Sequence, residues 1–190
     1  MKIAITGIIG SGKSEVSNIV REKGARVLSA DAINKELLLN TEYLKKLKNL
    51  FPSAFCGDTF VKSKLTQIVF ENEKELAKLN ALAHPEIMGV MMKRAEGEDL
   101  VFCEVPLLDQ NMAKEFDRVW LVRSKDEKRI ERICKRDGRT KEEAMKMLCS
   151  QDKYKNINYD NCDIINNDGN IKDLHAVVEK LYCKLTVKNA

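Results

Sequence analysis

The sequence predicts an α/β fold in which a parallel sheet has helices on both faces. Short apolar runs of four to six residues alternate with longer stretches of helical periodicity, which is typical of that fold. A glycine-rich segment directly follows the first run, an arrangement that suits phosphate binding between a strand and a helix. The 190 residues, 44% hydrophobic and 33% charged, suffice for one domain with a sizeable core.

The predicted elements follow this alternation along the chain. Strands are expected at the apolar runs Ile3–Thr6, Arg26–Ser29, Leu100–Val105, Arg118–Val122 and Asp163–Asn166. Helices are expected where apolar residues recur at helical spacing, at Lys13–Lys23, Asp31–Leu39, Thr41–Leu50, Lys64–Asn80, Pro85–Ala95, Lys125–Arg136 and Ile171–Leu185.

Two stretches are longer than a simple connection between neighbouring strands. About 70 residues separate the second and third predicted strands, far more than one crossover requires. We therefore expect a helical substrate-binding excursion over about residues 31–97. A second stretch, about residues 137–161, is rich in Lys, Arg and Asn and is expected to be a mobile lid. The core of the single domain would then comprise residues 1–30, 98–136 and 162–190.

Composition excludes several classes of protein. The net charge of +4, from 33 Lys and Arg against 29 Asp and Glu, is not typical of a nucleic-acid-binding protein, although it is compatible with phosphate ligands. No apolar run approaches the roughly 20 residues that span a bilayer. The first residues predict a strand and a turn instead of a signal peptide, so we expect a cytoplasmic protein without a membrane partner. The six cysteines are scattered, without a C-x-x-C pair, and are assigned no chemistry.

The strongest motif is Gly7-Ile8-Ile9-Gly10-Ser11-Gly12-Lys13-Ser14, which matches the phosphate-loop pattern G-x-x-x-x-G-K-[ST] in full. Glycines let such a loop wrap closely around phosphates, and the following helix adds its positive dipole end. Lys13 is expected to reach the β- and γ-phosphates of a nucleoside triphosphate, and the Ser14 hydroxyl to bind Mg²⁺. The predicted ATP-binding residues here are Gly10, Ser11, Gly12, Lys13, Ser14 and Glu15.

A phosphate loop alone leaves a kinase, a GTPase switch and a motor-type ATPase open. A GTPase would carry an N-K-x-D segment after a later strand, and this sequence has none. A remodelling ATPase usually has more domains than 190 residues allow. A small-molecule kinase needs a base for the acceptor hydroxyl, a carboxylate for magnesium and cations for the transferring phosphoryl group.

Two carboxylates follow predicted strands, where ligands of parallel sheets bind. Asp31 follows the strand that ends at Ser29 and is a candidate general base; an N-cap for the helix after it fits equally well. Glu104 ends the run Leu100–Val105 and is a candidate magnesium carboxylate, although an isolated acid at a strand end can also be merely solvated.

Arg129, Arg132 and Arg136 recur at the spacing of one helix face. Such a face is ordinarily solvated, but beside a phosphate loop and a lid its arginines can stabilise the charge of the transferring group. His84 precedes Pro85, and a proline at the first helical position explains that pair structurally.

The chain resembles the dephospho-CoA kinase family over nearly its whole length. The matching segments, in order, are Ile5–Ser14, Ala30-Asp31, Ile68-Val69-Phe70, Leu79-Asn80, His84-Pro85, Val105-Pro106-Leu107-Leu108, Glu131-Arg132, Lys135-Arg136-Asp137, Gln151 and Ile165-Asn166-Asn167. The V-P-L-L segment and the H-P pair are more specific than the phosphate loop, which many proteins share.

The resemblance implies ATP-dependent phosphorylation of the ribose 3′-hydroxyl of dephospho-CoA, with ATP and Mg²⁺ required. It implies a fold like that of nucleoside monophosphate kinases, with a five-stranded parallel core, a helical CoA-binding domain and a lid. Asp31 becomes the expected base, and Arg136, with Arg132, a lid cation that acts together with Lys13. Asn167 would lie near the adenine, and His84, Pro106 and Leu107 would border the acceptor pocket. A monomer or weak homo-oligomer is expected.

The sequence departs from the family pattern at several positions. Ser29 replaces a usual acid, Gln110 a glutamate and Met147 an arginine, while Glu15 and the pair Asn161-Cys162 also differ. None of these changes removes Lys13, Ser14, Asp31 or Arg136. Two alternatives remain: a phosphate-loop kinase for another small alcohol, and a nucleotide-binding regulator without catalytic activity.

Overall fold

The computed structural model describes residues 1–70, 72–155 and 157–186. The chain divides into two compact units, one of residues 1–29 and 97–190 and one of residues 30–96. In the part of the chain described, no helix is both long and apolar enough to cross a membrane.

The first unit is built on a parallel sheet. Within the described residues this sheet has five strands, in the order β2-β5-β1-β6-β7. The strands are β1 (Lys2–Thr6), β2 (Arg26–Ser29), β5 (Val101–Glu104), β6 (Arg118–Arg123) and β7 (Cys162–Asn166). All five coincide with the predicted apolar runs to within two residues at each end. The predicted parallel α/β fold is confirmed.

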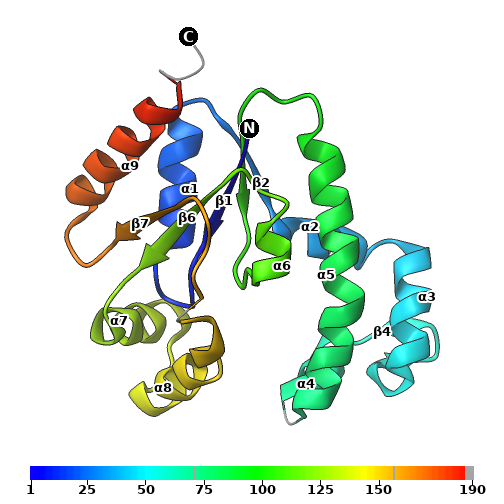
Figure 1. Cartoon of the computed structure of the whole chain (residues 1–190). Helices are drawn as coiled ribbons and strands as arrows, with labels where there is room; N and C mark the ends of the chain where they lie inside the picture. The colour runs from blue at the N-terminus through cyan, green and yellow to red at the C-terminus, as the bar shows by residue number, and fades with distance from the viewer. Residues whose placement is uncertain (71, 156, 187–190) are drawn as a thin grey trace. The chain divides into compact units, whose positions relative to one another are not determined.

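The helices of this unit are α1 (Lys13–Glu22), α6 (Gln110–Ala113), α7 (Asp126–Asp137), α8 (Lys141–Cys149) and α9 (Ile171–Thr186), with the 3₁₀ turn η2 (Asp152–Tyr154). Helices α1 and α9 lie along the sheet and share one apolar core with it (Figure 1). Trp120 and Phe102 are buried there with their ring centroids 5.0 Å apart. Apolar burial on this scale holds β1 firmly in the middle of the sheet.

The second unit is mainly helical. It consists of α2 (Ala30–Leu37), α3 (Thr41–Leu50), the 3₁₀ turn η1 (Pro52–Ala54), a hairpin of β3 (Phe55–Cys56) and β4 (Thr59–Phe60), α4 (Lys62–Phe70) and α5 (Glu73–Ala95). Its core contains Leu47, Phe51, Ala54, Phe55 and Leu65. The sequence does not predict the hairpin, because each strand has two residues and shows no alternation.

Two of the predicted helices in this unit are wrong. The predicted helix Lys64–Asn80 is interrupted, because α4 ends at Phe70 and the side chain of Asn72 caps a new helix by accepting from the backbone N–H of Lys74 at 2.9 Å. The helix predicted to start at Pro85 is also wrong: α5 runs through this proline, which lies inside it. Packing of buried residues such as Met88 and Met91 offsets the backbone hydrogen bond that proline removes.

Candidate active site

The phosphate loop connects the central strand β1 to α1. Gly10 and Gly12 have φ angles of 77° and 95°, in the left-handed region that glycine tolerates. Space also requires glycine, since a Cβ on Gly10 would come within 2.9 Å of the Arg129 carbonyl oxygen and one on Gly12 within 2.1 Å of Asn167 Nδ2. Gly12 is the N-cap of α1 and supplies no side-chain cap, so the first amides of α1 are available to an anion.

A cavity of about 700 Å³ opens beside this loop. The lining residues come from the loop, from α7 and from the region that joins β7 to α9: Gly10, Gly12, Lys13, Ser14, Glu15, Arg132, Ile133, Lys135, Arg136, Asn167, Gly169, Ile171 and Leu174. Basic and amide side chains thus face a pocket with several apolar residues. Such a surface suits a nucleotide, whose phosphates are charged and whose base is flat and largely apolar.

Ser14 and Glu104 meet at the carboxyl end of the sheet. The Ser14 hydroxyl donates to Glu104 Oε1 at 2.9 Å. Glu104 is the last residue of β5, and the register pairs it with Ile5 on β1 and with Ser29 on β2. The contact joins the two residues that the sequence predicts as magnesium ligands. Among the described residues, His, Cys, Asp and Glu form no group of three that could hold a metal ion without other ligands.

Lys13 lies at the start of α1, and its Nζ atom is 3.4 Å from the carbonyl oxygen of Ile8, within the same loop. The ammonium group is therefore held over the loop, beside the cavity that Lys13 lines. A cation at this place can neutralise phosphate charge.

Arg132 ties α7 to the phosphate loop. Its Nη1 donates to the carbonyl oxygens of Gly10 at 3.1 Å and Ser11 at 3.3 Å, and its Nη2 donates to the carbonyl oxygen of Asn167 at 2.8 Å. The Asn167 amide in turn donates to the Ser11 carbonyl at 2.9 Å. The loop, α7 and the end of β7 therefore form one hydrogen-bonded unit.

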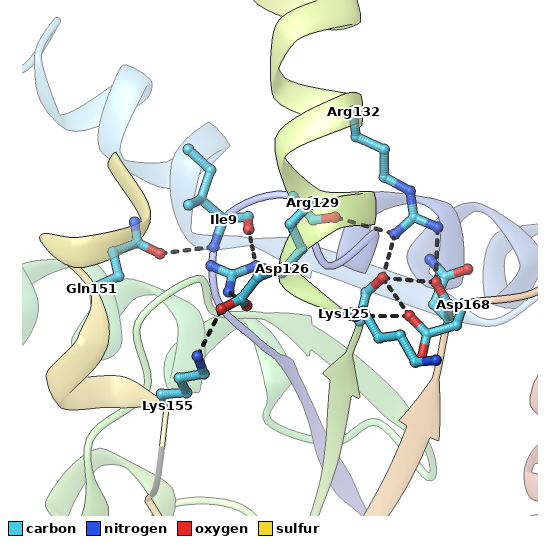
Figure 2. Close-up of polar contacts among 11 residues, drawn as sticks. Ile9, Lys125, Asp126, Arg129, Arg132, Gln151, Lys155 and Asp168 are labelled. Atoms are coloured by element: carbon cyan, nitrogen blue, oxygen red, sulfur yellow. Dashed lines mark hydrogen bonds and ion pairs between the residues drawn. The ribbon is translucent and has the colours of Figure 1, made fainter. Parts of the chain in front are cut away.

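Asp168 reinforces that junction. Its carboxylate accepts from the backbone N–H of Lys125 at 2.7 Å and from the Ser124 hydroxyl at 2.8 Å (Figure 2). These bonds, led by that of the Lys125 amide, lower the pKa of Asp168. The carboxylate thereby fixes the turn that precedes α7.

Arg136 lies one turn further along α7 and also lines the cavity. Its Nε and Nη2 donate to the two carboxylate oxygens of Asp137 at 2.7 and 2.8 Å. This pairing lowers the pKa of Asp137 and orients the guanidinium of Arg136. Most of the Arg136 side chain nevertheless remains exposed. Arg136 is therefore accessible to a ligand, whereas Arg132 is already bonded to the loop.

The chain matches a family of known proteins over most of its length. The family model for dephospho-CoA kinase matches residues 1–173 of this chain. The chain belongs to the dephospho-CoA kinase family.

Relatives over nearly the full length agree. The dephospho-CoA kinase of Thermus thermophilus is 31% identical, over 97% of this chain and 91% of the relative, and that of Fusobacterium nucleatum is 32% identical over 97% of each. A crystal structure from Thermus thermophilus matches 97% of both chains with a TM-score of 0.79 at 31% identity. The predicted family, kinase class and place in coenzyme A biosynthesis are confirmed, and ATP is the nucleotide that this family uses.

The remaining predicted residues of this dephospho-CoA kinase family member lie outside that cavity. Pro106 and Leu107 follow β5 and are partly exposed. Asp31 is exposed in the first turn of α2, and half-buried His84 lies within α5, both in the unit of residues 30–96. The reading of Asp31 as an N-cap is wrong, because α2 already begins at Ala30.

Two further residues contact the phosphate loop. The sequence places Arg129 on a basic helix face whose arginines can stabilise the transferring group, and it singles out Gln151 only as a match to the family pattern. Arg129 is only 1% exposed, so neither a solvated face nor a lid cation describes it; its Nε donates to the Ile9 carbonyl at 2.8 Å. Gln151 accepts the Ile9 N–H through Oε1 at 2.7 Å (Figure 2). Helical spacing could flag Arg129 but could not show its burial, and a single glutamine carries no local signal.

Two of the residues that depart from the family pattern, Met147 and Gln110, make defined contacts in the structure. Met147 packs beside an apolar cluster of Ile133, Ala144 and Leu148, which joins α7 to α8. Gln110 donates to the carbonyl oxygen of Asn158 at 3.4 Å. Both side chains therefore make contacts within the unit that contains the phosphate loop.

Proposed function

We propose that this chain transfers the γ-phosphoryl group of ATP to the ribose 3′-hydroxyl of dephospho-CoA, giving CoA and ADP. The observation that carries the proposal is the contact between Ser14 and Glu104 at the base of a complete phosphate loop, in a chain of this family. Phosphoryl transfer needs cationic side chains that bind the phosphates, a carboxylate that binds the metal ion and an oriented acceptor. The first two requirements are met by residues of this unit.

In this proposal Lys13 and the amides of residues 10–15 bind the β- and γ-phosphates of ATP. Arg136 supplies positive charge to the transferring group, and Arg132 holds the loop carbonyls so that the amides face the phosphates. Asn167, which lines the cavity at the end of β7, contacts the adenine side of the nucleotide.

Mg²⁺ suits the oxygen donors present. The hydroxyl of Ser14 and the carboxylate of Glu104 are hard ligands that lie 2.9 Å apart, and this ion typically completes its shell with water and substrate phosphates. We propose that these two residues hold it, directly or through water. When bound, the ion neutralises charge on the phosphate oxygens.

Asp31 is proposed as the base that accepts the proton of the acceptor hydroxyl and orients its oxygen. The chain connection supports this role: Asp31 is two residues after Ser29, so their Cα atoms are no more than about 7 Å apart. Ser29 pairs with Glu104 at the carboxyl end of the sheet. In-line attack needs an oriented oxygen more than a strong base, since the transition state is loose.

We further propose that residues 30–96 bind the acceptor, with His84, and that Pro106 and Leu107 border its pocket. Residues 137–161 are proposed as a lid that brings charge to the nucleotide and excludes water. A cytoplasmic location and a monomeric or weakly homo-oligomeric state complete the proposal.

The test measures ADP release from Mg-ATP with dephospho-CoA, adenosine, AMP or no acceptor, with Lys13→Ala as the inactive control. Release that depends on dephospho-CoA, with CoA identified by mass, is the expected result. Release with another alcohol would reassign the acceptor. Nucleotide binding without any release would identify a non-catalytic regulator instead.

A further inference from the structure

The backbone of Ile9 is held on both sides by side chains from distant parts of the chain. Its N–H donates to Gln151 Oε1 at 2.7 Å, and its carbonyl oxygen accepts from Arg129 Nε at 2.8 Å (Figure 2). The side chain of Ile9 packs against the cluster that joins α7 to α8. Both backbone polar groups of Ile9 and its side chain are therefore held by residues outside the phosphate loop.

The two clamping side chains are themselves connected. Arg129 Nη1 donates to Asp126 Oδ1 at 2.7 Å, and Lys155 Nζ donates to Asp126 Oδ2 at 2.9 Å. Lys155 follows Gln151 by one 3₁₀ turn, whose backbone bonds include that of the Tyr154 N–H to the Gln151 carbonyl at 2.9 Å. The segment 151–155 is thus attached at one end to the phosphate loop and at the other to the first turn of α7.

Ile9 immediately precedes the part of the loop that lines the cavity. Gly10 follows it in the left-handed region and lies against the backbone of Arg129, where an added Cβ would be 2.9 Å from the carbonyl oxygen. The Ile9 carbonyl and the Gly10 N–H belong to the same peptide group. Because the loop binds phosphate through its amides, fixing the backbone of Ile9 therefore sets the direction of the Gly10 amide. Holding this peptide in place before ATP arrives lowers the conformational cost of binding.

We propose that Gln151 is a positioning residue for ATP, which acts by accepting the Ile9 N–H and so couples residues 151–155 to the phosphate loop. This proposal adds a positioning residue to the proposed kinase function. It rests on that function only for the identity of the bound nucleotide, ATP. Coupling is reciprocal: if residues 151–155 stabilise the ATP-binding form of the loop, ATP stabilises residues 151–155 to the same extent.

The test compares Gln151→Ala and Gln151→Met with the wild type by calorimetric titration of the full chain with Mg-ATP, without acceptor. Methionine keeps the length of the side chain and removes the amide acceptor. We expect both variants to bind ATP about fivefold to tenfold more weakly, the effect of losing one hydrogen bond. Lys180→Ala, at an exposed position on α9 outside the proposed lid, is the control and should bind ATP like the wild type.

Kinetics separate positioning from general damage. The KM for ATP should rise by the same factor, while the KM for dephospho-CoA and the kcat at saturating ATP stay within about twofold of the wild type. Equal rises in both KM values would overturn the proposal, as would wild-type ATP affinity in Gln151→Met. Because the titration contains no acceptor, it gives its answer even if the acceptor assignment is wrong.

Amide hydrogen exchange of the wild type keeps the proposal testable if the variants do not fold. Adding Mg-ATP should slow exchange in residues 148–155 together with residues 7–14. Slower exchange in the loop alone, with residues 148–155 unchanged, would refute the coupling.

Discussion

Replacing Gly12 with alanine tests whether the geometry around the phosphate loop controls nucleotide binding. The new Cβ would lie 2.1 Å from Asn167 Nδ2, at a residue with φ of 95°. An L-residue in the left-handed region costs roughly 1–2 kcal/mol. Asn167 is nearly buried and must move, which breaks its 2.9 Å hydrogen bond to the Ser11 carbonyl and costs about 0.5–1.5 kcal/mol more.

Gly24→Ala is the matched control. Gly24 also has a positive φ of 82°, but an added Cβ there would meet no atom within 4 Å, and it follows the end of α1 that is remote from the phosphate loop. This variant should show the backbone strain alone, lowering the melting temperature by about 2–4 °C per kcal/mol. Gly12→Ala should be less stable by about 2–3 kcal/mol and, because Asn167 lines the cavity, should bind ATP at least about tenfold more weakly.

The assays are thermal unfolding and titration with Mg-ATP. We expect the control to bind ATP within about twofold of the wild type. Wild-type ATP affinity in Gly12→Ala would refute the reasoning, because the contact of Gly12 with Asn167 would then have no influence on the nucleotide. An equal loss of affinity in Gly24→Ala would also refute it.

Four further substitutions test the other roles. Asp31→Asn should lower turnover by about 100-fold or more while the Kd for ATP stays within about twofold; near-normal turnover removes Asp31 from the role of base. Lys13→Ala should weaken ATP binding and slow phosphoryl transfer, and an unchanged rate of ADP release would contradict its contact with the phosphates. Glu104→Gln should raise the Mg²⁺ concentration at half-maximal activity, whereas an unchanged metal titration would exclude Glu104 as a ligand. Hydrogen bonds from Lys155 and from α7 lower the pKa of Asp126, so its contribution to stability is present above its unfolded pKa of about 3.9 and is lost as the pH falls through the lower folded value. Asp126→Asn should therefore weaken the dependence of the unfolding free energy on pH below about pH 4. The difference should be less than about 1 kcal/mol, because the ion pair between Asp126 and Lys155 is half-exposed. Denaturation curves with the same pH dependence as the wild type would contradict this.

The sequence predicts the sheet well because burial leaves a local signal. Strands such as Val101–Glu104 lie in the middle of the sheet and are buried over most of their length, so they occur as continuous apolar runs. The phosphate loop is equally visible, because its glycines and Lys13 are fixed by steric and charge requirements at fixed spacing.

Local patterns do not predict where long-range packing overrides propensity. Pro85 is a strong helix-start signal, yet α5 passes through it because residues on both sides pack in the same unit. The basic spacing of Arg129 is typical of a solvated helix face, yet the side chain is buried against Ile9. Contacts between residues 120 or 142 positions apart, such as those of Ile9, have no counterpart in any window of the sequence.

The place of β1 at the centre of the sheet has a consequence for synthesis of the chain. Ile5 pairs with Glu104 on one side and with Trp120 on the other, so β1 has no neighbouring strand until almost 100 further residues have been made. Residues 30–96 have their partners within one continuous stretch and can fold as soon as they leave the ribosome. Closure of the sheet, and with it formation of the phosphate loop, is the slow, non-local step. Until it is complete, the apolar residues of β1 remain unpaired and exposed in the growing chain, where they can associate with other chains.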